Sequence, residues 1–148
     1  MPVLAQLYQS VQLPNTILMQ LINEELLNSV SAEAAENLRL RKNYNLHPNL
    51  DDKVQRLLNA LEPGTELPVH RHRHTDETYL LLRGSLILKL YDDSKTLIGE
   101  YVLNPETGNY GASIPAGQWH TIEVLEKGTV IFEVKEGPYA PLSDEDIL

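Results

Sequence analysis

Apolar residues change their spacing near residue 50. Between Ile17 and Leu26 they recur every three or four positions, which predicts an amphipathic helix after Pro14 and Asn15. Ser31 is well placed to cap a second, short helix over residues 32–36. We expect the apolar stripe of this helical segment to cover one face of the domain that follows, rather than to bind a partner protein.

From Val54 onward, short apolar runs alternate with turn residues such as Gly, Pro, Asn and Asp. Seven strands are predicted, over residues 54–61, 78–82, 85–91, 97–103, 113–114, 121–125 and 129–135. Many short strands at close spacing indicate an all-β sandwich or barrel rather than alternating strands and helices. The sequence therefore predicts an N-terminal helical extension over residues 1–50, a β-barrel domain over 51–142 and a solvated acidic tail over 143–148.

Composition narrows the classes of function. The length of 148 residues fits one domain, and 42% hydrophobic with 22% charged residues is ordinary for a globular protein. Twelve Lys and Arg stand against 21 Asp and Glu, and the formal charge of −9 argues against nucleic acid as a partner. The chain has no cysteine, which excludes disulfides, thiolate catalysis and cysteine-bound zinc.

Location follows from two further features of the sequence. No apolar run approaches the ~18 residues that a membrane-spanning helix needs. The first residues lack the basic and then apolar pattern of a secretory signal. We therefore expect a cytoplasmic protein without a membrane partner, in which any metal is held by nitrogen and oxygen atoms.

The most informative stretch is rich in histidine. In an extended chain His70 and His72 share a face about 7 Å apart, so both imidazoles can reach one ion, whereas His74 lies about 13 Å from His70 and we expect it to be exposed. Glu77 can return a carboxylate to this site if the chain bends after His74, and His120 on another strand is the evident fourth ligand. A His-x-His pair alone is as often a polar strand face as a metal site, but the surrounding spacing favours the site.

The spacing of these residues resembles a motif of a known protein superfamily. The string Gly64-x5-His70-x-His72-x4-Glu77-x6-Gly84 resembles the first conserved motif of the cupin superfamily. Residues 115–120, Pro-x-Gly-x2-His, resemble the core of its second motif. The resemblance implies a small antiparallel β-barrel, or jelly roll, that holds one divalent metal through three His and one Glu, here His70, His72, Glu77 and His120.

The second motif departs from the superfamily pattern at two positions. Asn109 stands where the leading Gly is expected, and Val124 stands where the closing Asn is expected. Neither position is a ligand, so the departures affect the turn geometry and not the implied metal site.

Four further stretches narrow the resemblance. Residues 39–47 (RLRKNYNLH), 52–56 (DKVQR), 68–72 (PVHRH) and 133–139 (EVKEGPY) are similar to the WbuC family of cupin-fold metalloproteins. The similarity covers nearly the whole chain after its first dozen residues. It implies a role in surface-polysaccharide biosynthesis, because members of that family are typically found beside such genes, and it implies no particular reaction.

Several chemical roles stay open. Imidazole and carboxylate ligands suit Fe, Mn, Ni or Zn. Four protein ligands leave two positions open on an octahedral ion, whereas a tetrahedral zinc would be closed and structural. The chain is then a metal-dependent enzyme acting on a small polar metabolite such as a sugar derivative, of the isomerase or dioxygenase type, or a non-catalytic module that binds a small ligand through the metal. A hydrolase is disfavoured because the sequence has no Gly-x-Ser-x-Gly or His-Glu-x-x-His motif.

Other polar residues are candidates for the mouth of the barrel. His47 is a candidate for handling protons in catalysis. Arg and Asn donors for an anionic or hydroxylated substrate are expected at Arg39, Arg41, Asn43 and Arg56, unless this stretch is a solvated linker with a salt-bridged Arg.

Three further expectations concern packing and assembly. Glu133 and Lys135 are read as an outward-facing charge pair on one strand, and Trp119 as a packing residue rather than a sugar platform. We also expect a homodimer, because the edge strands of a small barrel need cover.

Overall fold

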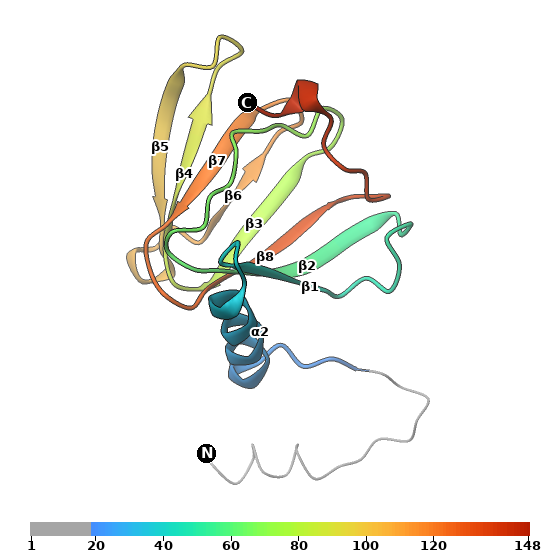
Figure 1. Cartoon of the computed structure of the whole chain (residues 1–148), viewed down its shortest axis with the longest axis vertical. Helices are drawn as coiled ribbons and strands as arrows, with labels where there is room; N and C mark the ends of the chain where they lie inside the picture. The colour runs from blue at the N-terminus through green and yellow to red at the C-terminus, as the bar shows by residue number, and fades with distance from the viewer. Residues whose placement is uncertain (1–18) are drawn as a thin grey trace, which may run out of the picture.

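A computed structural model describes residues 19–148, which form two antiparallel sheets that face one another (Figure 1). The five-stranded sheet has the order β1-β2-β8-β3-β6, and the three-stranded sheet has the order β5-β4-β7. The strands are β1 (Arg41–Asn45), β2 (Val54–Leu61), β3 (Glu77–Arg83), β4 (Leu86–Tyr91), β5 (Leu97–Leu103), β6 (Gly111–Ile114), β7 (Trp119–Val124) and β8 (Thr129–Glu136). The all-β, two-sheet architecture with an N-terminal helix is as expected. No helix in the described range is long and apolar enough to cross a membrane.

All seven predicted strands are present, and their ends differ from the prediction by at most two residues. The eighth strand, β1, was not predicted. Its sequence, RKNYN, has a single large apolar side chain, Tyr44, and three residues (Lys42, Asn43 and Asn45) of types that are depleted in strands. It forms because its backbone pairs with β2, from Arg41 opposite Leu61 to Asn45 opposite Leu57. An edge strand made of such residues depends on its neighbour rather than on its own propensity.

The prediction of two N-terminal helices is wrong for the described residues, which contain one α-helix, α2 (Glu24–Glu36). Asn23 caps it, accepting a 3.0 Å hydrogen bond from Leu26 N at its side chain. Ser31 is not a cap but a buried residue in the middle of α2. Residues 19–22 precede the helix without being helical, and the predicted start at Ile17 and Leu18 lies outside the described residues.

Helix α2 covers the outer face of the five-stranded sheet (Figure 1), but not through the predicted stripe, since Leu21 and Ile22 precede the helix and are exposed. The buried cluster at this contact comprises Leu27, Val30, Ala34, Leu58, Ala60 and Val130. Even-numbered residues of β2 therefore face the helix, whereas Leu61 belongs to the cluster between the two sheets. That second cluster contains Tyr79, Leu81, Leu86, Leu88, Leu103, Ile114, Ile122, Val124 and Ile131. The alternation decides which side chains of each strand can reach the interior.

Gly84 of the first motif has a conformational role at the turn from β3 to β4. Its φ is +85°, and a Cβ there would lie 2.7 Å from the Cα of Thr129. An L side chain would meet both a left-handed backbone and a backbone clash, so the chain requires glycine at this point.

The C-terminal residues are docked in part: Ser143, Asp144 and Glu145 are exposed, as expected of a solvated tail, but Asp146 and the residues after it contact the barrel. Asp146 accepts a 2.8 Å hydrogen bond from Arg71 Nε and a 2.9 Å bond from Arg73 Nη2. Ile147 pairs with His70 in an isolated bridge, and Leu148 N donates to Val69 O at 2.8 Å. Two arginines of the histidine stretch thus hold the acidic end against the barrel, while Glu145 keeps most of its side chain in solvent.

Candidate metal centre

Four side chains converge at one end of the space between the sheets. One potential ligand atom from each of His70, His72, Glu77 and His120 lies within 4.8 Å of every other. His70 and His72 come from the segment before β3, Glu77 is the first residue of β3, and His120 is the second residue of β7. Residues some 50 positions apart in sequence are thus brought together by the pairing of a loop with a strand.

The histidine segment does not form a strand. His70 makes an isolated antiparallel bridge, in which His70 N donates to His120 O at 3.0 Å and His120 N donates to His70 O at 2.8 Å. Gly117 N also donates to His72 O at 2.8 Å. The rings of His70 and His72 are 5.3 Å apart between centroids, which is closer than the spacing along an extended chain predicts.

Backbone carbonyls orient two of the imidazoles. His70 Nδ1 lies 2.9 Å from Pro68 O, and His120 Nδ1 lies 2.8 Å from Gln118 O. A carbonyl oxygen only accepts hydrogen bonds, so each Nδ1 carries the hydrogen and each Nε2 keeps a free lone pair in the neutral ring. Metal-binding histidines are commonly oriented in this way, by a backbone carbonyl that accepts a hydrogen bond from the ring nitrogen that does not bind the metal.

Glu77 supplies the observation that tests whether a cation fits. Its Oε2 is buried, has no hydrogen-bond partner, and lies 3.3 Å from both His72 Nε2 and His120 Nε2. A buried carboxylate oxygen among imidazole lone pairs is costly unless something positive satisfies it. Bonds of about 2.0–2.2 Å to one ion place its ligand atoms about 3–4 Å apart, which these four side chains can match with small adjustments. The residues fit a divalent metal.

The protonation of His70 agrees with that fit. Burial, followed by the charge of His120, lowers the pKa of His70 to about 4. The ring is therefore neutral at physiological pH and able to donate a lone pair.

A cavity of about 420 Å³ opens onto His70, His72 and Glu77. Three residues expected at the mouth, Arg39, Arg41 and Asn43, line this cavity. Sequence reasoning missed the other polar lining residues, which come from the interior faces of β2, β3 and β8 and from the C-terminal segment: Asn59, Tyr79, Glu133, Lys135 and Tyr139.

Other candidates lie elsewhere. Arg56 is exposed on the side of β2 that faces α2, and His47 is buried with its Nδ1 against the backbone of Arg56, so neither lines the cavity. His74 is exposed, as expected. Trp119 is 5% exposed and lies under the Arg71 guanidinium, 4.7 Å from ring centroid to Cζ, which agrees with a packing role.

The outward charge pair expected at Glu133 and Lys135 is wrong, because both residues line the cavity and Glu133 is buried. Asn59 Nδ2 donates to Glu133 Oε1 at 3.0 Å. Burial, followed by the charge of Glu77, raises the pKa of Glu133 to about 8. The alternation with buried Ile131 on the same strand face was the signal that could have placed Glu133 inside.

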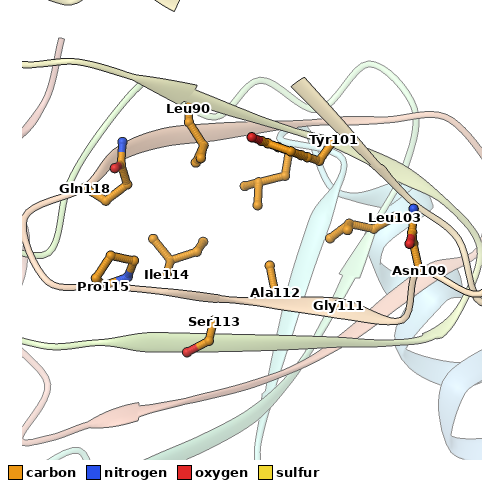
Figure 2. Close-up of a pocket in the computed structure, with 11 residues that line it drawn as sticks. Leu90, Tyr101, Leu103, Asn109, Gly111, Ala112, Ser113, Ile114, Pro115 and Gln118 are labelled. Carbon is orange, nitrogen blue, oxygen red and sulfur yellow. The ribbon is translucent and has the colours of Figure 1, made fainter. Parts of the chain in front are cut away.

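A second cavity, of about 330 Å³, lies at the seam between β4, β5 and β6. Figure 2 shows Leu90 and Tyr101 on one side and Ala112 and Ile114 on the other. Its lining is mostly apolar and contains no His, Asp, Glu, Lys or Arg. Acid–base or metal chemistry therefore belongs to the cavity at His70 and Glu77.

Comparison with known families decides the classification. The sequence matches the family described as "Domain of unknown function (DUF6016)" over residues 22–103, more than half of the chain. The chain belongs to the DUF6016 family. A comparison with curated proteins found none that matches this DUF6016 chain.

Solved structures show its fold. The capsular polysaccharide assembling protein CapF from Staphylococcus aureus is similar with a TM-score of 0.52 and 23% identity, over 62% of this chain and 25% of that one. The Schizosaccharomyces pombe Cnp3 cupin domain gives 0.51 and 14%, over 65% and 63%. Oxalate oxidase in complex with the substrate analogue glycolate gives 0.53 and 17%, over 69% and 53%. The DUF6016 chain spans about a quarter of CapF and about half of oxalate oxidase, and it has the cupin fold.

Proposed function

We propose that this DUF6016 protein is a cupin metalloprotein that binds one divalent metal and acts on a small polar metabolite, such as a sugar derivative. The ligands are His70, His72, Glu77 and His120. The observation that carries the proposal is the buried Glu77 Oε2, unpartnered and 3.3 Å from two imidazole nitrogens. A cation bound at this oxygen would satisfy the buried carboxylate.

When held by these four residues, the metal would supply a Lewis acid. The side chains that line the cavity would limit water and position the ligand. Leu67 and Ile122 give the cavity apolar walls that limit water, and Tyr79 places its hydroxyl 3.4 Å from His120 Nε2. Asn59, Glu133 and Lys135 present polar groups to a ligand between these walls.

Metal content tests the proposal. Purified full-length protein should contain about one Fe, Mn, Ni or Zn per chain by elemental analysis, whereas His72→Ala and His120→Ala should contain much less. His74→Ala is the matched control, since His74 belongs to the same stretch but is exposed. Equal metal content in His72→Ala and the wild type would contradict the proposal.

The reaction is tested on the metal-loaded protein. Consumption of a sugar, sugar acid or keto acid, followed by NMR, would establish an enzyme. Binding by calorimetry without consumption would establish the alternative, a non-catalytic module that holds a small ligand through its metal.

The finer biological assignment is part of the same proposal. The four stretches similar to the WbuC family support membership of that family and a role in surface-polysaccharide biosynthesis. The likeness to CapF, whose name describes capsular polysaccharide assembly, is consistent with that role. We also propose a cytoplasmic location, in keeping with a chain that has no cysteine.

We further propose a homodimer formed through β5. This edge strand exposes Leu97, Ile98, Tyr101 and Val102. A second copy would cover this apolar edge, which isolated sheet edges require. Light scattering should then give twice the mass of the chain, and Ile98→Glu should shift the population towards the monomer.

A further inference from the structure

Polar side chains form a continuous group on the inner face of the five-stranded sheet. Asn43 pairs with Asn59 across β1 and β2, and Tyr79 pairs with Glu133 across β3 and β8. Directly paired residues share a face of the sheet. The group therefore runs across the cavity wall from β1 towards Glu77, over three strand spacings or about 14 Å. Few sheets in a small domain turn so polar a face inward unless it contacts a ligand.

Two arginines stand at the β1 end of this group. Arg39 and Arg41 both line the cavity, and neither forms an ion pair with a carboxylate in residues 19–148. Arg41 Nη1 instead donates to the neutral carbonyl of Glu66 at 2.8 Å. Burial, followed by the charge of Arg39, lowers the pKa of the Arg41 guanidinium.

Two more groups in the cavity lack partners. Lys135 faces the interior from β8, opposite Gln55 and Glu77, and forms no ion pair with any described carboxylate. Asn59 donates its Nδ2 to Glu133, but its Oδ1 is buried and has no hydrogen-bond partner. Buried polar atoms are normally satisfied, so Asn59 Oδ1 indicates a missing donor such as a ligand hydroxyl.

We propose that Arg39 and Arg41 bind the carboxylate or phosphate of a hydroxylated small molecule whose hydroxyls contact Asn59 and reach the candidate metal ligands. The inference rests on the proposed function, since it names the ligand class for the same cavity. Arg guanidinium groups bind carboxylate and phosphate in bidentate fashion. Because the chain as a whole carries a formal charge of −9, two arginines that form no ion pair within residues 19–148 mark this site as a place where an anion can bind. A volume of about 420 Å³ suits a molecule of monosaccharide size.

The test compares three probes on the metal-loaded, full-length protein by calorimetry: D-glucuronate, D-glucose 6-phosphate and neutral D-glucose. At least one anionic probe should bind about tenfold or more tightly than glucose, and the stronger of the two identifies the preferred anion. Arg39→Gln and Arg41→Gln should each lower that preference about tenfold, and Arg41→Lys should restore part of it. Arg39 makes no side-chain hydrogen bond in the described residues, so Arg39→Gln remains informative if Arg41→Gln folds poorly.

Lys42→Gln is the matched control. Lys42 follows Arg41 on β1 but pairs with Ala60, which faces α2, so this variant should bind all three probes as the wild type does. An anion preference that survives both Arg39→Gln and Arg41→Gln would mean that the metal itself holds the anion, and the inference fails. It also fails if the fully metallated protein binds neither anionic probe, whereas protein that takes up no metal would instead overturn the proposed function.

Discussion

His70 and His120 exchange both of their backbone hydrogen bonds, at 3.0 and 2.8 Å, although they lie in a loop and in a strand respectively. This pair fixes the distance between the first motif and the second. The imidazoles face one another with centroids 4.5 Å apart, and each Nδ1 is bonded to a carbonyl of its own segment. The geometry of the candidate metal centre is therefore set by the backbone before any ion binds.

Glu77→Gln should lower the free energy of unfolding when metal is bound and raise it when the metal is removed. In chelator the variant should be more stable than the wild type by about 1–3 kcal/mol, because it replaces a buried, unpartnered carboxylate by a neutral amide. At a metal concentration a thousand times its dissociation constant the wild type gains about 4 kcal/mol, so it should then exceed a variant that binds no metal by about 1–3 kcal/mol. Thermal unfolding with and without chelator measures both, and a wild type insensitive to chelator would contradict the metal site.

Arg83→Ala should loosen α2 from the barrel. The guanidinium of Arg83 donates to Asn28 Oδ1 at 2.7 Å, to Ser31 Oγ at 3.0 Å and to Gly128 O at 2.7 Å. We expect a loss of about 2–3 kcal/mol in the free energy of unfolding, measured with urea. Arg56→Ala should change it by less than about 0.5 kcal/mol, because within residues 19–148 the Arg56 side chain makes a single hydrogen bond, of 3.5 Å to Leu46 O. Equal losses in the two variants would rule out this anchoring role.

Leu58→Ala should destabilise the contact between α2 and the sheet. Leu58 is fully buried in the cluster with Val30 and Val130, so its truncation leaves a cavity and costs about 2–5 kcal/mol. Leu82→Ala is the control, since Leu82 is 40% exposed on the outer face of β3 and should cost much less. Denaturant unfolding of both variants decides whether α2 is an integral layer of the fold.

Gly84→Ala and Gly108→Ala should destabilise the protein to different extents, because one adds both a left-handed backbone and a steric clash and the other only a left-handed backbone. Both glycines have φ of +85°, but only Gly84 would also place a Cβ against the backbone of Thr129. Gly108→Ala should cost about 1 kcal/mol for its left-handed backbone alone, and Gly84→Ala should cost clearly more. Similar unfolding free energies for the two variants would show that the turn at Gly84 can relax.

Acid should release the C-terminal segment. Hydrogen bonds from Arg71, and further ones from Arg73 and Ser143, lower the pKa of Asp146 from 3.8 to about 2. A depressed carboxyl pKa stabilises the docked state fully above about pH 4, and this contribution is lost as the pH falls towards 2. Trp119 is the single tryptophan and lies under Arg71, so its fluorescence should change over this range.

Asp146→Asn controls the acid experiment. At pH 7 the variant should already show much of the fluorescence change, because the amide cannot pair with Arg71 and Arg73 as an anion. A variant spectrum identical to that of the wild type at pH 7 would show that Asp146 does not hold Arg71 in place.

The sequence by itself determined the local features. Strands 54–61 and 97–103 follow from short apolar runs bounded by turn residues, and their predicted ends agree with β2 and β5. The spacing of Gly64, His70, His72, Glu77 and Gly84 named the residues of the first motif, and the second motif added His120. These signals are readable because periodicity and turn chemistry act over a few residues.

Tertiary structure decided what depends on a neighbour. β1 exists because its backbone pairs with β2, and α2 (Glu24–Glu36) lies where its apolar side chains meet Leu58 and Val130. Glu133 faces the cavity, and Arg56 faces away from it, because strand register assigns alternate side chains to opposite faces. Register and packing depend on contacts between distant segments, so the alternation along a single strand does not by itself decide which face is the interior.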